Sequence, residues 1–219
     1  MCKAMLWANR NGVMYVLDRT TGEFLQGRPF VKVNWMDGFD EKGRPIRVPG
    51  KVPVGSGGDG TPIMPTVLGG TNCYPPSFSP KTGLFYVSAW ENSKSGGGGQ
   101  RGGANTTPMA DTVLAPNVKT EEEGYGVVRA FDPRTLEKKW EFKMNDITWA
   151  GVLTTAGDLV FSGGREGYFF ALDARNGTLL WKVALGGHVN SGPMSYAVNG
   201  RQYIAVAAGQ SLFAFALRQ

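Results

Sequence analysis

Runs of apolar residues alternate with short turn segments along this chain, and one such unit is clearest between residues 167 and 185. Tyr168–Leu172 is a continuous run of β-favouring or small apolar residues, which is typical of a strand covered on both faces. The segment 173–177, DARNG, supplies turn chemistry, because Asp can bond its own backbone and Asn-Gly tolerates positive φ. Residues 179–183 resume the apolar run. The pattern predicts a β-hairpin in which Trp181 follows Asp173 at a fixed distance.

The same unit occurs twice more. Residues 127–143 place Asp132 and Trp140 at the offsets of Asp173 and Trp181, and the two aspartates are 173 − 132 = 41 residues apart. That spacing lies within the period expected for a four-stranded propeller blade. Residues 15–25 form a weaker copy around Asp18 that lacks the tryptophan. The repeat predicts an all-β fold, a β-propeller or part of one, with Trp140 and Trp181 buried between neighbouring blades.

Other segments show the same short apolar runs with turn residues between them. The further strands predicted from them are residues 4–7, 13–17, 30–35, 77–90 (a hairpin), 151–155, 159–162, 193–198, 202–208 and 212–217. Residues 93–117 are of low complexity and are expected to form a glycine-rich surface insertion. They are not a phosphate loop, because no Gly-Lys-Ser/Thr follows the glycines.

Composition supports this interpretation and excludes several classes of protein. Gly accounts for 32 of 219 residues, which favours short strands and turns over helices. The net charge is +5, but Lys and Arg are scattered, so no basic stripe suggests a nucleic-acid partner. No run of 18 apolar residues predicts a membrane span, and the N-terminal residues do not form a signal peptide. The chain starts inside an apparent strand, which suggests a fragment.

Residues with catalytic chemistry are few. His188 is the single histidine, and its glycine-flanked loop favours a backbone-bonded role over that of a catalytic base. No His or Cys cluster has metal-ligand spacing. The two cysteines, Cys2 and Cys73, are too few for a disulfide scaffold, although they could form one pair.

Five blocks in order along the chain carry a resemblance to a known family. They are residues 8–24, 69–87, 149–163, 167–185 and 193–209. In these blocks the chain resembles the C-terminal half of a PQQ-dependent (quinoprotein) alcohol dehydrogenase. The resemblance implies an eight-bladed propeller, of which residues 1–219 would supply about four four-stranded blades.

The resemblance also implies a function. Members of this family oxidise a small alcohol by hydride transfer to PQQ, with Ca²⁺ bound in the N-terminal half, and pass electrons to a cytochrome or a quinone. A periplasmic location is implied as well. Three positions match cofactor contacts of the family: Arg10 corresponds to an arginine beside the reactive carbonyl, Asn72 to an asparagine after a Gly-Gly turn, and Trp149 to a tryptophan at the cofactor's edge.

Several positions depart from the family pattern. Cys73 stands where the family has a tryptophan, and Gln210 to Leu212 replace a tryptophan-containing loop over the cofactor. The family's catalytic aspartate, calcium ligands and adjacent cysteines match no residue of this chain, so no catalytic or metal-binding residue is assigned. These departures leave a second hypothesis open, in which the protein is a non-catalytic quinoprotein-like propeller that binds another protein without a cofactor.

Overall fold

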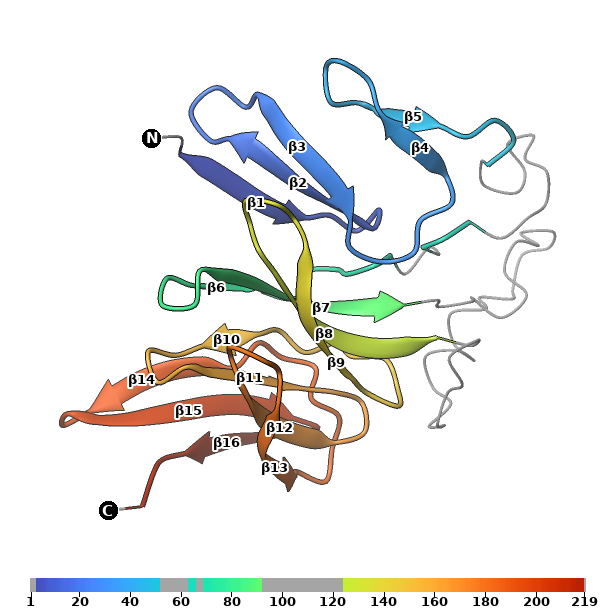
Figure 1. Ribbon diagram of the computed structural model, residues 1–219. Helices are drawn as coiled ribbons and strands as arrows, with labels where there is room; N and C mark the ends of the chain where they lie inside the picture. The colour runs from blue at the N-terminus through green and yellow to red at the C-terminus, as the bar shows by residue number, and fades with distance from the viewer. Residues whose placement is uncertain (1–2, 52–62, 66–68, 92–123, 219) are drawn as a thin grey trace, which may run out of the picture. The chain divides into compact units, whose positions relative to one another are not determined.

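The computed structural model describes residues 3–51, 63–65, 69–91 and 124–218. The chain divides into two compact units, residues 1–72 with 90–125 and residues 73–89 with 126–219 (Figure 1). The glycine-rich insertion expected at 93–117 and Cys2 lie outside the described residues. The single propeller portion expected over 1–219 remains a prediction.

The first unit contains two small antiparallel sheets. One is the meander of β1 (Ala4–Ala8), β2 (Val13–Asp18) and β3 (Phe24–Pro29), and the other pairs β4 (Met36–Phe39) with β5 (Pro45–Arg47). The strand predicted at 30–35 is wrong. These residues instead pack over the β1–β2 turn, where Trp35 Nε1 donates a hydrogen bond to the Asn11 carbonyl at 3.0 Å. Their apolar pattern reflects burial against this turn rather than pairing in a sheet.

The second unit holds most of three meander sheets. The first is β6 (Ser77–Ser79), β7 (Leu84–Glu91), β8 (Tyr125–Phe131) and β9 (Lys138–Lys143), in which Trp90, Glu91 and Tyr125 belong to the first unit. The next is β10 (Leu153–Thr154), β11 (Leu159–Gly163), β12 (Tyr168–Asp173) and β13 (Leu179–Ala184). The last is β14 (Met194–Val198), β15 (Arg201–Ala208) and β16 (Ser211–Phe215).

These elements confirm the all-β prediction. No helix occurs in the described ranges, so none there could cross a membrane. Two of the sheets have four strands in sequential order, as the repeat predicts, whereas β1–β3 and β14–β16 have three.

The three sequence repeats share one turn geometry. The carboxylate Oδ1 of Asp18, Asp132 and Asp173 accepts a hydrogen bond from the backbone N–H two residues later, at 2.7, 2.8 and 2.8 Å. The backbone carbonyl of each Asp accepts from the residue four positions later, which has φ of 78°, 56° and 75° in turn. Hydrogen bonds from Arg175 lower the pKa of Asp173, so this carboxylate stays charged as an acceptor.

Trp140 seals the core between two sheets of the second unit. Its side chain is 8% exposed and packs on Tyr86, and its Nε1 donates to the carbonyl of Ala174 at 3.0 Å. The Tyr86 hydroxyl donates to the same carbonyl at 2.9 Å, and burial raises the pKa of this phenol, which keeps it protonated. The prediction for Trp140 is therefore confirmed.

The prediction that Trp181 is buried is wrong, because its side chain is 39% exposed. It packs edge-on against Phe169 and Phe215, so it does contact the neighbouring sheet β14–β16. The difference lies in that neighbour. Around Trp140 the turn that follows β12 supplies the covering Ala174, whereas the sheet beside Trp181 has three strands and no such turn after β16 in the described residues.

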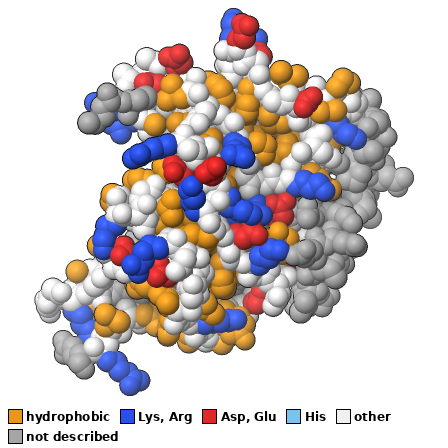
Figure 2. All heavy atoms as spheres, in the orientation of Figure 1, with side chains coloured by type: hydrophobic (Ala, Val, Ile, Leu, Met, Phe, Trp, Pro, Cys, Tyr) orange, Lys and Arg blue, Asp and Glu red, His pale blue; other side chains and the backbone are white. Residues whose placement is uncertain are grey.

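Charged side chains of both signs are intermingled on the described part of the surface in Figure 2. Glu141 illustrates this mixing, because its Oε2 lies 3.0 Å from Arg129 Nε and 2.6 Å from Lys138 Nζ. The view therefore agrees with the scattered charge of the sequence and shows no field of one sign on that face.

Replacing the two tryptophans should separate their contributions to stability. Trp140→Ala should lower the free energy of unfolding by about 3–5 kcal/mol, because it removes a buried aromatic ring. Trp181→Ala should cost clearly less, since part of that ring is already in water. Denaturant unfolding of both variants measures the two values, and equal losses would contradict the packing described.

A second test concerns Gly177, which has φ of 75° and whose added Cβ would lie 2.6 Å from Trp140 Cε3. Gly177→Ala should destabilise the protein by about 2–4 kcal/mol, from backbone strain plus this clash. Gly200→Ala is the matched control, because Gly200 has φ of 77° with nothing within 4 Å, and it should cost about 1 kcal/mol. Similar melting temperatures for the two variants would show that the Trp140 ring moves away from the added Cβ without a loss of stability.

Candidate functional site

Arg10 is exposed on the tight turn between β1 and β2, and several hydrogen bonds fix this turn. Gly12 N donates to the Asn9 carbonyl at 3.0 Å, and Val13 N donates to the Asn11 side chain at 3.0 Å. Gly12 has φ of 92°, and a Cβ there would lie 2.8 Å from Val33, so glycine is required on both grounds. The backbone that carries Arg10 is therefore well fixed.

The segment that carries Asn72 lies against the Arg10 turn within the same unit. Gly70 N donates to the Arg10 carbonyl at 2.9 Å, and the Gly70 carbonyl accepts from Trp90 N at 2.8 Å. Gly69 has φ of 86°, and a Cβ on it would overlap the Arg10 side chain at Cγ. Gly69 and Gly70 therefore allow this backbone segment to approach Arg10 closely. Asn72 follows them as an exposed side chain.

Trp149 belongs to the second unit, in the connection between β9 and β10. Its neighbours are well fixed: Thr148 Oγ1 donates to the Gly163 carbonyl at 2.7 Å, and Asp146 Oδ1 accepts from Ile147 N at 2.7 Å. The indole itself is half-buried, and its Nε1 has no hydrogen-bond partner among the described residues. Two of the three predicted cofactor contacts thus share a unit, and the third is held separately in the other.

Arg165 is a residue that the sequence did not single out. It lies on the turn between β11 and β12, is 6% exposed, and places its guanidinium carbon 5.3 Å from the centre of a Trp149 ring. Its Nε is 3.7 Å from Asp146 Oδ2, and its Nη1 lacks a partner in the described part of the chain. The signal that could have revealed it is positional, because Arg165 precedes Asp173 by the same eight residues that separate Arg10 from Asp18.

The remaining candidates carry no site. His188 is exposed and its backbone carbonyl accepts from Gly209 N at 2.9 Å, while the role predicted for its side chain stays a prediction. Cys73 is exposed, and its pairing with Cys2 is untested, since Cys2 is not described. Over the described ranges no group of three His, Cys, Asp or Glu side chains could hold a metal ion.

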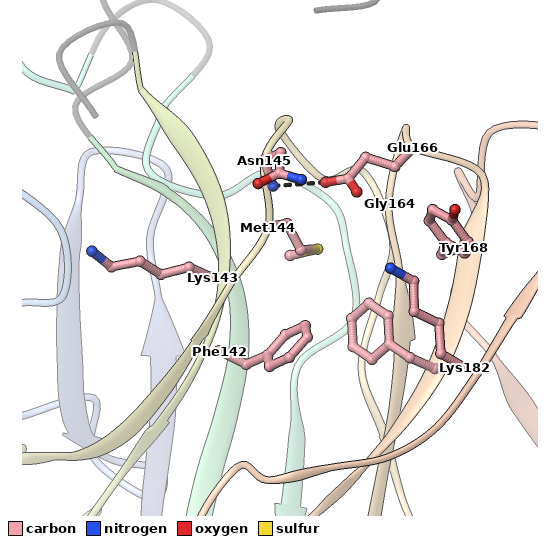
Figure 3. Close-up of a pocket in the computed structure, with 9 residues that line it drawn as sticks. Phe142, Lys143, Met144, Asn145, Gly164, Glu166, Tyr168 and Lys182 are labelled. Carbon is pink, nitrogen blue, oxygen red and sulfur yellow. Dashed lines mark hydrogen bonds between the residues drawn. The ribbon is translucent and has the colours of Figure 1, made fainter. Parts of the chain in front are cut away.

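A small pocket opens beside the β11–β12 turn in the second unit (Figure 3). Its volume of about 90 Å³ is lined by Phe142, Lys143, Met144, Asn145, Gly164, Glu166, Tyr168, Phe170 and Lys182. Glu166 Oε1 accepts from Asn145 N at 2.6 Å, and Lys182 Nζ lies 3.6 Å from the Tyr168 ring centre. The volume of this hollow is far below the roughly 300 Å³ at which ligand pockets begin, so it is too small for a cofactor.

Comparison with known proteins identifies the architecture. Residues 143–204 match the family model "PQQ: Glucose/ethanol/alcohol dehydrogenase, beta-propeller domain". The quinoprotein alcohol dehydrogenase PedH of Pseudomonas putida is 37% identical over 215 residues, which cover 94% of this chain and 36% of that protein.

Solved structures agree. The quinohemoprotein alcohol dehydrogenase from Comamonas testosteroni superposes with a TM-score of 0.74 at 29% identity, covering 96% of this chain and 32% of that one. A europium-containing methanol dehydrogenase gives a TM-score of 0.72 at 30% identity, covering 93% and 36%. The chain thus spans about a third of the length of these relatives.

These matches show that the meander sheets are blades of a partial β-propeller of the PQQ-dehydrogenase type. The chain matches about a third of the length of quinoprotein alcohol dehydrogenases, as the resemblance predicted. The residues present fit the family's cofactor. Trp149 has a buried indole N–H with no partner among the described residues. Gly69 and Gly70 pack so closely against the Arg10 turn that neither has room for a Cβ.

The support under Arg10 can be tested with PQQ as the probe. Gly69→Ala should weaken binding of PQQ to the intact protein that carries this chain by about tenfold, because the new Cβ displaces Arg10 and a charge-assisted hydrogen bond is worth about 1.5–3 kcal/mol. Gly22→Ala is the control, since Gly22 has φ of 78° in the same unit with nothing within 4 Å. If equilibrium dialysis gives the same PQQ affinity for Gly69→Ala and Gly22→Ala, Gly69 plays no part in the site.

Proposed function

We propose that the protein carrying this chain is a PQQ-dependent dehydrogenase that oxidises a small alcohol. The observation that supports this most directly is the arrangement in the first unit, where a fixed turn presents Arg10 beside the segment that ends in Asn72. Both residues match cofactor positions of the family, and a packed backbone holds both. The rigidity is what a charge-stabilising group requires, since a preorganised donor costs no reorganisation when charge develops.

Each proposed contact has one role. PQQ, when bound, supplies the hydride acceptor and is the oxidant of the reaction. Arg10 holds a permanent positive charge toward the oxygen on which negative charge develops, since a guanidinium keeps its proton. Asn72 would orient the ligand through its amide, and Trp149 would place the uncovered part of its ring at the edge of the ligand.

The metal, the electron acceptor and the location complete the proposal. We propose Ca²⁺ as the metal from the family resemblance, with a lanthanide as the alternative that the europium-containing relative suggests. A cytochrome or a quinone is proposed as the electron acceptor, and the periplasm as the location. Activity of the metal-depleted intact protein after addition of Ca²⁺ or a lanthanide ion distinguishes the two metals.

A second candidate function is a protein-binding propeller without a cofactor. Two departures favour it: Cys73 in place of the family's tryptophan, and the strand β16 beginning at Ser211 where the family has a tryptophan loop. A chain of this second kind would have no use for the glycines that pack against Arg10. The fit of those glycines makes the dehydrogenase the stronger proposal.

Replacing Arg10 tests the proposed function. Arg10→Ala in the intact protein should lower kcat for dye-linked alcohol oxidation by about 10²–10³, the range expected on loss of one preorganised charge-stabilising group. Arg19→Ala is the control, because Arg19 is also an exposed arginine of the first unit, one residue beyond β2. Wild-type turnover in Arg10→Ala refutes the role of Arg10. Failure of the unmodified protein to bind PQQ favours the cofactor-free propeller instead.

A further inference from the structure

Arg165, Trp149 and Asp146 form a contiguous cluster in the second unit, in which Arg165 and Asp146 are buried and Trp149 is half-buried. The guanidinium carbon of Arg165 lies 5.3 Å from a ring centre of Trp149, and its Nε lies 3.7 Å from Asp146 Oδ2. The side chains of Arg165 and Asp146 are 3% and 7% exposed. A desolvated guanidinium over an indole attracts the ring strongly, because no water competes for the cation.

Trp149 differs from other indoles of this protein in how its ring is fixed. Trp140 and Trp35 each anchor their ring through their own N–H, which donates to the carbonyls of Ala174 and Asn11 at 3.0 Å. The Trp149 N–H has no such partner in the described ranges. The Arg165 guanidinium lies over the Trp149 ring, and the buried indole N–H makes no hydrogen bond to the described residues.

The internal repeat gives independent support. Arg10 and Arg165 both precede the repeat aspartate by eight residues, since 18 − 10 = 8 and 173 − 165 = 8. Their turns are built alike. Gly12 N donates to the Asn9 carbonyl at 3.0 Å, and Gly167 N donates to the Gly164 carbonyl at 3.1 Å, so in each turn the bond spans the arginine. The same blade position thus carries an arginine once exposed and once buried against a tryptophan.

We propose that Arg165 is a positioning residue of the cofactor site: it holds the Trp149 indole in place, so that the uncovered part of the ring is presented to PQQ. The inference rests on the proposed function. It assigns Arg165 no contact with the cofactor, because its guanidinium is enclosed by the protein and already faces the tryptophan and Asp146.

A double-mutant cycle on the intact protein tests this. PQQ affinity is measured by equilibrium dialysis for Arg165→Met, for Trp149→Phe and for the double variant. Arg165→Met should weaken binding by about tenfold, the order expected when a desolvated cation–π contact is lost. The double variant should bind PQQ no more weakly than Trp149→Phe alone, because Arg165 acts through the indole. Arg165→Lys, which keeps a cation over the ring, should recover part of the affinity.

The matched control is Arg129→Met. Arg129 is also a buried arginine of the second unit, 5% exposed, and its Nε lies 3.0 Å from Glu141 Oε2. It should lose thermal stability, because Glu141 loses its contact with the guanidinium, but keep wild-type affinity for PQQ. This separates a general loss of stability from an effect on the site. If Arg165→Met does not fold, Arg165→Lys takes its place in the cycle.

Two results overturn the inference while leaving the proposed function intact. One is wild-type PQQ affinity in Arg165→Met. The other is an equal loss from Arg165→Met with and without Trp149, which would indicate a direct contact with the cofactor instead. If the unmodified protein binds no PQQ, the proposed function fails and the inference fails with it.

Discussion

The register of the blade hairpins depends on one hydrogen-bonded turn, which an aspartate closes at the end of β2, β8 and β12. Each turn is followed by a one-residue bulge offset in the ladder, so that Ala130 faces Trp140 and Ala171 faces Trp181. Because side chains alternate across a strand, a slip of one residue would turn either tryptophan to the opposite face. The Asp turn therefore determines which side of each sheet can pack against the next.

That packing continues into the positions of the site residues. With Trp140 fixed on the carbonyl of Ala174, the sheets β6–β9 and β10–β13 share a core that includes Met144 and Phe170. The chain leaving β9 then runs directly from this core to Trp149. In the first unit the equivalent precision comes from glycines, since Gly12 and Gly69 allow two backbone segments to meet at Arg10. Site geometry in both units is thus a consequence of core packing one turn away.

Much of this fold could be predicted from sequence because its signals are local. The Asp turns, Asn-Gly pairs and apolar runs are each recognised within about ten residues, and the strands they predicted, apart from 30–35, are present. The segment 30–35 was mistaken for a strand because burial against a turn and burial in a sheet give the same apolar pattern. The exposure of Trp181 depends on what lies beside its sheet, which no pattern near residue 181 encodes. The three cofactor candidates came from resemblance to a family, not from local chemistry.

Arg165 shows why some of the site required coordinates. Burying a guanidinium costs several kcal/mol, and a single carboxylate at 3.7 Å offsets this only in part. Burial of Arg129 carries the same cost, but its Nε lies only 3.0 Å from Glu141 Oε2. Stability alone does not require this ion pair, since replacing Arg165 and Asp146 together by well-packed apolar residues would often be neutral or stabilising. The loosely paired arginine is therefore best explained by the tryptophan it covers.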